Sequence, residues 1–387
     1  MHALSRALRP RRIIRTALVV SVLSLAIGGA ATAQPLFQRN LVSDVPGLAL
    51  LTDANLRNPW GMSFGPSTPF WISDQVTSLS TLYTVASLNN PIKVPLEVSI
   101  PTTAAGPQGP TGQVFNSTGG FQVNGSDSRF IFANLNGTIS AWNGSLGTTA
   151  QVVVPAEPGT IYTGLAINTD PAHGPLLYAA NTLGGEIEVY DNGFNEVTLG
   201  AGAFIDPDPE VAGLVPFNVQ SIGNDVYVTY AAPGRDAQIA APHGSGAVAV
   251  FDTAGNFIRT LISDGQLASP WGLALAPAGF GSFGGDLLVG NFSFVASEIN
   301  AFDPATGAFR GTIPIDMTGF TPGGLWALNF GNGVTGDQNT LFFTNGINGE
   351  RNGLFAAIAV PEPATPLLLS IGLVGLLLAP GVRTRAS

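Results

Sequence analysis

Carboxylate and amide side chains recur at one place in this sequence, the end of a short β-rich run, in five of six similar segments. Their oxygen atoms could coordinate a cation, and their amides could bind a ligand. Tight turns select the same residue types, because Asn and Asp tolerate the left-handed backbone conformation. The pattern therefore predicts either a ligand-binding ring or six turns, and we favour the turns. The six residues are Asp74, Asn134, Asn181, Tyr230, Asn291 and Asn345.

A second acidic group precedes the fourth segment, where Asp206, Asp208 and Glu210 alternate with prolines. Three carboxylates this close together would suit Ca²⁺, a hard cation that takes about 6–8 oxygen ligands. No EF-hand or nonapeptide calcium pattern accompanies them, however. A metal site is one interpretation, and a solvated surface turn is the one we favour.

The fourth segment also carries an unusually long loop, residues 230–246, which contains Arg235, Asp236 and His243. Long loops on a rigid scaffold are where binding residues concentrate. These three side chains are therefore candidate ligand-binding residues, together with Asn218 at the start of the same segment.

The sequence contains few residues of the types that usually act in catalysis. The chain has no cysteine, which excludes disulfides, thiolate catalysis and cysteine-bound zinc. Beyond the N-terminal region only His173 and His243 remain, so a centre built from several histidines is excluded. No Gly-x-Ser-x-Gly, His-Glu-x-x-His or phosphate-binding glycine loop occurs. A non-catalytic role is favoured.

Charge and composition limit the classes of partner that the protein can bind. Of the 387 residues 45% are hydrophobic and 10% charged, with a mean hydropathy of +0.30, which excludes a disordered chain. Residues 34–360 hold 8 basic and 24 acidic side chains, a net charge of −16. Such a body would repel nucleic acid and anionic membrane surfaces, so neither is expected as a partner.

Internal repeats predict the architecture. The hexapeptide Pro-Trp-Gly-Met-Ser-Phe at residue 59 returns as Pro-Trp-Gly-Leu-Ala-Leu at residue 270, with weaker copies near 110, 162, 216 and 322. Each copy leads into short strands broken by Gly, Asn and Asp, which is typical of a propeller blade. We expect an all-β, monomeric six-bladed β-propeller over residues 36–360, with four-stranded antiparallel blades.

Two further features concern packing in this ring. Residues 39–44 copy residues 259–264, an outer strand, so residues 37–43 are predicted to complete the last blade and cover its edge. Trp60 and Trp271 share one blade position and Trp326 lies two residues beyond it, which indicates core packing. Trp142 is the expected exposed exception.

Both ends of the chain resemble sorting signals. Residues 1–33 combine basic residues, an apolar run and Ala31-Thr32-Ala33, as in a secretory signal removed by signal peptidase. Val360-Pro361-Glu362-Pro363 precedes an apolar stretch at residues 366–382, and arginines follow. Residues 361–387 thus resemble the PEP-CTERM signal of Gram-negative bacteria, which implies a transmembrane helix and cleavage by an exosortase; a plain membrane anchor is the alternative.

The blades resemble known propellers as well. Residues 270–313 are similar to an NHL-type blade, and residues 36–363 resemble an uncharacterised family of PEP-CTERM propeller proteins. Gluconolactonase-type propellers hold Ca²⁺ with acidic and amide residues at the heads of their innermost strands. The matching heads here are Gly61, Gly112, Gly164, Asn218, Gly272 and Gly324.

Together these features predict an exported protein, held transiently at the inner membrane by its C-terminal helix alone and then released to the cell surface or matrix. We expect a non-catalytic binding or structural module that engages exopolysaccharide or another envelope partner and needs no cofactor. The alternative is a calcium-dependent hydrolase or lactonase-like enzyme. It would use Asn218, Asn181 and Asp74 as ligands and His243 or Asp236 as base.

Overall fold

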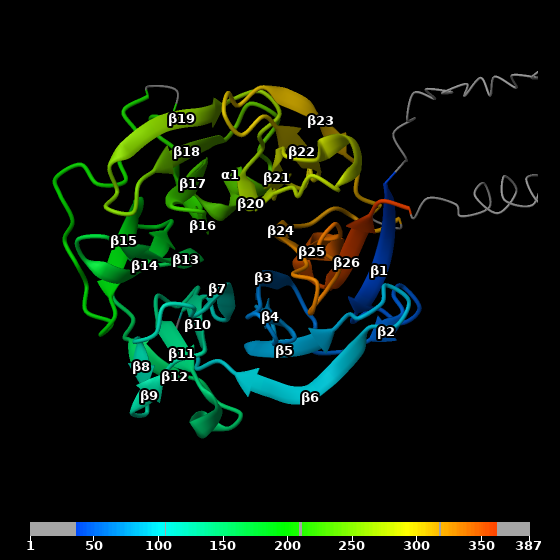
Figure 1. Ribbon diagram of the computed structural model, residues 1–387, viewed down its shortest axis with the longest axis horizontal. Helices are drawn as coiled ribbons and strands as arrows, with labels where there is room; N and C mark the ends of the chain where they lie inside the picture. The colour runs from blue at the N-terminus through cyan, green and yellow to red at the C-terminus, as the bar shows by residue number, and fades with distance from the viewer. Residues whose placement is uncertain (1–35, 105, 209–210, 317–318, 362–387) are drawn as a thin grey trace, which may run out of the picture. The chain divides into compact units, whose positions relative to one another are not determined.

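Six antiparallel sheets are arranged as blades around a central axis (Figure 1). The computed structural model describes residues 36–361, apart from residues 105, 209–210 and 317–318. All of them belong to the second of two units into which the chain divides, residues 34–387. The first strand of each blade is the innermost one. The six-bladed β-propeller predicted from the repeats is therefore confirmed.

The first three blades follow the order of the sequence. Blade 1 contains β3 (Pro59–Ser63), β4 (Phe70–Asp74), β5 (Leu79–Thr84) and β6 (Ile92–Ser99). Blade 2 contains β7 (Pro110–Phe115), β10 (Phe130–Asn134), β11 (Ile139–Trp142) and β12 (Gln151–Val154), with a side hairpin of β8 (Gln122–Val123) and β9 (Ser126–Asp127) and the 3-10 turn η1 (Gly144–Leu146). Blade 3 contains β13 (Tyr162–Asp170), β14 (Gly174–Asn181) and β15 (Glu186–Asp191).

The other three blades complete the ring. Blade 4 contains β16 (Val215–Ile222), β17 (Asp225–Ala231), α1 (Arg235–Ile239), β18 (Ala247–Phe251) and β19 (Phe257–Ser263). Blade 5 contains β20 (Pro270–Leu275), η2 (Gly281–Phe283), β21 (Leu287–Asn291), β22 (Ile299–Phe302) and β23 (Phe309–Ile313). Blade 6 contains β24 (Leu325–Phe330), β25 (Leu341–Asn345), α2 (Ile347–Glu350), β26 (Leu354–Ala359), β1 (Phe37–Ser43) and β2 (Leu51–Thr52).

The N-terminal strand closes the ring, as the sequence predicts. β1 pairs antiparallel with β26, from Phe37 opposite Ala359 to Ser43 opposite Leu354. The short β2 then adds to the outer side of β1 in parallel. Closure by the two ends of the chain leaves β26 with a partner on each side, so its edge is not open to other chains.

Blade 3 has three strands where four were expected. After β15 the chain turns and pairs only briefly, through the Val197 N–H to the Val189 carbonyl and a bridge between Tyr190 and Glu196. The following segment, residues 198–214, contains two prolines and three glycines. Proline lacks the N–H that a ladder needs, and glycine weakens strands, so no fourth strand forms.

Neighbouring inner strands approach very closely at one equivalent position, and glycine occupies this position in four of the six blades. A Cβ added at Gly61 would lie 2.4 Å from the Thr111 oxygen, and one at Gly272 would lie 2.2 Å from the Trp326 oxygen. Gly112 and Gly164 meet the next blade equally closely. These glycines permit the close approach of blades that a narrow ring requires.

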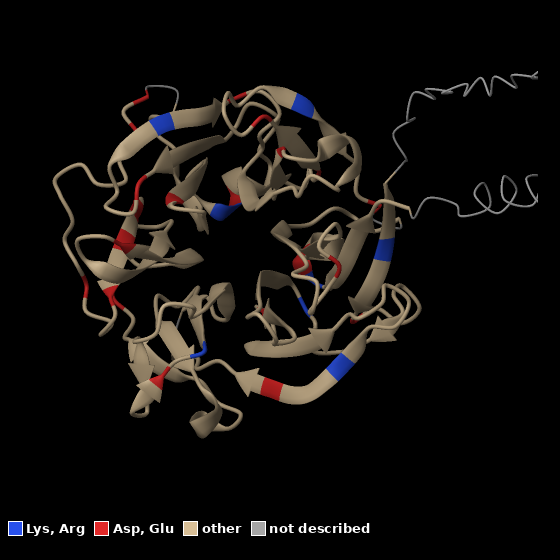
Figure 2. Ribbon diagram, viewed as in Figure 1, with Lys and Arg blue, Asp and Glu red and all other residues tan. Residues whose placement is uncertain are grey.

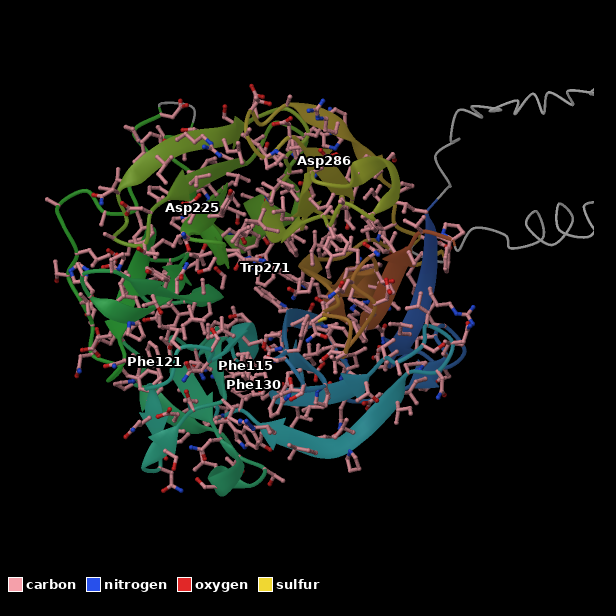
Figure 3. All side chains as sticks on the ribbon, viewed as in Figure 1. Phe115, Phe121, Phe130, Asp225, Trp271 and Asp286 are labelled. Carbon is pink, nitrogen blue, oxygen red and sulfur yellow. The ribbon has the colours of Figure 1, made fainter. Side chains whose placement is uncertain are left out.

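Three tryptophans fill the middle of this ring. The rings of Trp60 and Trp326 stack with centroids 3.5 Å apart, and Trp271 meets Trp326 edge-on at 5.5 Å. Trp271 lies beside the centre of the ring (Figure 3), and its indole Nε1 donates a hydrogen bond to the Thr163 oxygen, from blade 5 to blade 3. We call these three residues the tryptophan layer. The core role expected for them is confirmed.

Two expectations about tryptophan require correction. Pairing of Leu325 with Asn345 matches that of Pro59 with Asp74, so Trp326 is the direct equivalent of Trp60, and the sixth inner strand begins three residues after Pro322. Trp142 is buried at 6% exposure because it packs against Trp71 and donates from Nε1 to the Gly147 oxygen.

The predicted sorting segments, residues 1–33 and the apolar stretch at residues 366–382, lie outside the described residues. Within residues 36–361 as described, no helix is long and apolar enough to span a membrane.

The contact between blades 5 and 6 yields a prediction. Gly272→Ala would place a methyl group against the Trp326 carbonyl, and overpacking of this kind costs about 1–3 kcal/mol of unfolding free energy. Urea denaturation should show this loss. Gly200→Ala is the matched control, since a Cβ there has nothing within 4 Å; equal stability of the two variants would contradict the close-approach argument.

Candidate functional site

The six residues that close the second strands lie on one face of the ring, which we call the upper face. Asp74, Asn134, Asn181, Asn291 and Asn345 are the last residues of their strands, and Tyr230 is the last but one. All six are buried. The predicted ring thus exists as an arrangement of residues, but its side chains are covered by protein.

Their hydrogen bonds explain this burial. Asn291 accepts from the Ala268 N–H through Oδ1 and donates through Nδ2 to the Gln266 oxygen, so it fastens the loop that enters its blade. Oδ1 of Asn181 likewise accepts from the Ile161 N–H. Asp74 accepts from the N–H and the hydroxyl of Thr81 within blade 1. These side chains therefore make structural contacts, but the left-handed turn conformation expected from the sequence is not the reason for them, because all six residues lie in strands and none has a positive φ.

The predicted acidic group does not form a metal cluster among the described residues. Asp206 accepts from the Thr260 hydroxyl at 2.9 Å and from the Asp208 N–H, which fixes a surface turn. Glu210 lies outside the described residues. Across the described part of the chain, no group of three or more His, Asp or Glu residues is placed to hold a metal ion.

The three candidate ligand-binding residues in the long loop of blade 4 lie in different environments. His243 is exposed and pairs through Nε2 with Glu298 at 2.8 Å, and Asp236 is exposed in the first turn of α1. Arg235 alone turns inward. Its guanidinium carbon lies 4.1 Å from the centre of the Phe292 ring and 5.4 Å from those of Trp60 and Trp326. Arg235 therefore sits directly on the tryptophan layer.

Glu350 of α2 forms an ion pair with Arg235. The pair joins the loops that follow the second strands of blades 4 and 6. Asn348, Gly349 and Glu350 all have positive φ angles, 55°, 62° and 64°. A left-handed conformation is costly for Glu, and strain of this kind concentrates at binding sites. The strained turn holds the Glu350 carboxylate over the centre of the ring.

A cavity of about 360 Å³ opens beside this ion pair, and we call it the upper pocket. Its size falls within the range of about 300–1,000 Å³ that small-molecule sites occupy. Leu135, Ile161 and Leu183 form an apolar wall. Polar residues on the other sides come from blades 1, 3, 4 and 6. The polar residues are Asn58, Trp60, Gln75, Thr163, Thr182, Arg235, Gln238 and Glu350.

Several polar groups around the upper pocket have no partner within the described part of the chain. They include Nε1 of Trp60, Oγ1 of Thr182, Nη1 of Arg235 and Oε1 of Glu350, all of them buried. Gln238 also lines the upper pocket, and no hydrogen bond of its side-chain amide is formed within the described part of the chain, but its amide is not among the fully buried groups. Buried polar groups without partners are rare and costly. Four such groups belong to residues that line one cavity, which makes the upper pocket the candidate site.

Sequence reasoning identified Arg235 but missed Glu350, Gln238, Trp60 and Thr182. The signal available for Glu350 was the Asn-Gly-Glu-Arg-Asn-Gly run at residues 348–353, which follows the second strand of the sixth repeat as residues 232–246 follow that of the fourth. Gln238 lies one helical turn beyond Arg235, so its position depends on the helix α1, which the sequence did not predict.

The residues of the alternative enzyme are not assembled at one site. Asn218 lines a different cavity, below the tryptophan layer. Asn181 lines a third cavity of about 400 Å³ at blades 2 and 3, and its Nδ2 donates to Glu188. Asp74 is enclosed within blade 1.

Three known proteins are similar in sequence to this chain. No protein-family model matches the chain. It is 32% identical to uncharacterized protein R648 of Acanthamoeba polyphaga mimivirus, over 68% of this chain and 66% of that protein. It is 30% identical to uncharacterized protein L690 of the same virus, over 72% and 74%. Uncharacterized protein R640 is 30% identical over 46% of this chain and 33% of its own length.

Solved structures are more distant. A streptogramin B lyase structure aligns with a TM-score of 0.48 and 11% identity, over 85% of this chain and 98% of that one. Hydrazine synthase of Kuenenia stuttgartiensis aligns with a TM-score of 0.47 and 14% identity, over 77% and 76%.

Asp74 yields a prediction about pH. Burial raises the pKa of this carboxyl well above its usual value, although hydrogen bonds from Thr81 act in the opposite direction. In the unfolded chain the carboxyl loses its proton near pH 4, so above that pH the folded state binds more protons than the unfolded one. The stabilisation of the folded state by this group is fully present below about pH 4. It is lost as the pH rises through the pKa of the carboxyl in the folded state.

Asp74→Asn places the residue found in four other blades here and removes this titration. We expect the variant to gain in unfolding free energy over the parent between about pH 5 and pH 8, measured by urea denaturation. Exposed Asp236→Asn is the control and should gain nothing. Parallel pH profiles for Asp74→Asn and the parent would show that the buried carboxyl does not titrate in this way.

Proposed function

Because this chain belongs to the same protein family as the mimivirus protein L690, which is uncharacterized, we propose a function from its geometry. That function is non-catalytic binding of a polyhydroxylated ligand in the upper pocket. A single sugar unit of a polysaccharide is the ligand that suits it best. The observation that carries the proposal is that four buried polar groups without partners in the described chain belong to residues that line one cavity.

The balance of these groups favours sugar over a charged ligand. Trp60 Nε1 and Arg235 Nη1 donate, Glu350 Oε1 accepts, and the Gln238 amide and the Thr182 hydroxyl do both. A sugar hydroxyl also donates and accepts. The positive charge of Arg235 is matched by Glu350, so no net charge remains to select an anion or a cation. The apolar wall can contact the C–H face of a sugar ring.

Catalysis is not favoured at this site. Hydrolysis of a glycoside uses two carboxyl groups, one as acid and one as base or nucleophile. Glu350 is the one carboxylate among the described residues that line the upper pocket, and it is ion-paired with Arg235. We therefore propose binding without bond cleavage and without a metal cofactor.

The proposal extends to the location of the protein. Sorting signals at residues 1–33 and 361–387 would carry the propeller through signal peptidase and an exosortase to the surface or matrix of a Gram-negative cell, where exopolysaccharide supplies the sugar units. Mass spectrometry of the protein from its host tests this proposal. Both ends should be removed, and retention of the C-terminal peptide would contradict it.

The test of binding is a thermal-shift and calorimetric screen of the full chain with methyl glycosides of glucose, galactose and mannose, and with N-acetylglucosamine. A ligand raises stability by about 2.7 kcal/mol at a hundredfold excess over its dissociation constant, so weak binding is measurable. Gln238→Met should weaken binding of the active sugar about tenfold, because a buried hydrogen bond to the ligand is lost. The backbone of Gln238 is hydrogen-bonded to Gly234 and Ser269, but its side chain makes no hydrogen bond within the described chain, so folding stability should be retained.

Asp236→Asn, on the exposed side of the same helix, is the matched control and should bind like the parent. EDTA should leave binding unchanged. Stabilisation by Ca²⁺ with no response to any sugar would refute the proposal and favour the calcium-dependent enzyme. Equal affinity of Gln238→Met and the parent would place the sugar elsewhere.

A further inference from the structure

The outer side of blade 3 lacks a strand. Each of the other five blades has at least four strands, whereas blade 3 ends at its third strand, β15. Two residues of β15 direct main-chain groups outward, because the Val189 oxygen accepts from the Val197 N–H and the Asp191 N–H donates to the Asn195 oxygen. Within the described residues, the chain beyond Val197 makes no further main-chain hydrogen bond to β15.

This arrangement leaves the main chain of Ile187 without a partner on the outer side. Residues two apart in a strand direct their N–H and C=O to the same side, so Ile187 points outward like Val189 and Asp191. No described residue forms a main-chain hydrogen bond with its N–H or its oxygen on that side. An unpaired strand edge of this kind is a template for an extended segment of another chain.

The third cavity, of about 400 Å³, lies against the same strand, and we call it the acidic pocket. Alternate side chains of a strand share one face, so Glu186 and Glu188 of β15 line it together. Glu157 and Glu196 line it as well. Among the described lining residues there are thus four carboxylates and no lysine or arginine.

The carboxylates of the acidic pocket repel one another. Burial raises the pKa of Glu196, and the charges of the other three carboxylates raise it further. The chain has few cations to balance them, since residues 130–234 contain ten acidic side chains and no lysine or arginine. Blade 3 accordingly shows acidic and no basic positions (Figure 2). A positively charged partner would relieve this repulsion.

We propose that blade 3 binds a basic, extended peptide segment of a partner protein as its fourth strand. The central residue of the segment pairs antiparallel with Ile187 and exchanges both main-chain hydrogen bonds with it. The residues on either side of it lie opposite Glu186 and Glu188, so lysine or arginine at these two positions faces the acidic pocket. In strand addition the main chain supplies affinity, and pockets for alternate side chains supply specificity.

This surface is independent of the proposed sugar site, because no described residue lines both the acidic pocket and the upper pocket. Other occupants of blade 3 fit less well. No group of three or more described His, Asp or Glu residues is placed to hold a metal ion, so the carboxylates do not form a calcium site. A second copy of the chain would bring a second body with a net charge of −16 over residues 34–360 against this acidic edge.

The test is fluorescence anisotropy of the purified full chain with the labelled peptide acetyl-Thr-Lys-Val-Lys-Thr-amide at low salt. Two comparison peptides separate charge from main-chain pairing: one has glutamate in place of both lysines, and the other keeps both lysines but is N-methylated at the central valine. We expect saturable binding of the lysine peptide and binding at least about tenfold weaker for the other two, which corresponds to about 1.4 kcal/mol. These comparisons use the parent protein, so they do not depend on the folding of any variant.

Glu186→Gln combined with Glu196→Gln removes two carboxylates at exposed positions, and it should weaken binding of the lysine peptide about fivefold, because two ion pairs with the peptide are lost. The matched control is Asp127→Asn combined with Asp236→Asn, which removes the same charge from exposed positions of other blades and should bind like the parent. Absence of saturable binding to the parent would overturn the proposal. So would equal affinity for the glutamate or the N-methylated peptide, or unchanged affinity in the folded Glu186→Gln, Glu196→Gln variant.

Discussion

Neighbouring inner strands approach so closely that at four of the six contacts between blades only glycine fits, namely at Gly61, Gly112, Gly164 and Gly272. This constraint sets the width of the ring. Because the ring is narrow, the side chains one position earlier on three strands meet across its centre, and these are tryptophans. The glycines at these inner-strand positions thus have a structural reason of their own.

The tryptophan layer turns one channel into two cavities of different chemistry. Above it, aromatic faces stabilise the guanidinium of Arg235 through cation–π contacts. A partly buried cation is tolerated there because Glu350, held by a left-handed turn, neutralises it. Below the layer, a cavity of about 610 Å³ has no charged residue among its described lining residues, and amide and hydroxyl side chains provide its polarity.

The sequence predicted those features that repeat. Six similar segments and the copy of residues 259–264 at residues 39–44 were sufficient for the blade number and for the closing strand. Prediction was less accurate where the repeat is imperfect. Pro322-Gly323-Gly324 imitates the start of an inner strand, so Trp326 was placed two residues out of register with its true equivalents. Trp142, which precedes Asn143-Gly144, was expected to be exposed, and the sequence did not reveal its contact with Trp71 on a different blade.

The candidate site was only partly predictable for a related reason. The length of the fourth loop pointed to Arg235, because length is visible in a sequence. Glu350 and Gln238 depend on a left-handed turn and on a five-residue helix, and both are stabilised by contacts between distant blades. That a polar group has no partner is a property of the folded chain, so the groups that carry the functional proposal could not be identified from residue types.

The central claim is that the tryptophan layer separates a sugar site above from the rest of the channel. The most direct test is a crystal structure of the protein grown with the sugar that stabilises it most. The account predicts electron density for one sugar unit above Trp60, within hydrogen-bond distance of Gln238 and Glu350. Sugar density below Trp271, or on the outer strands with an empty upper pocket, would contradict it.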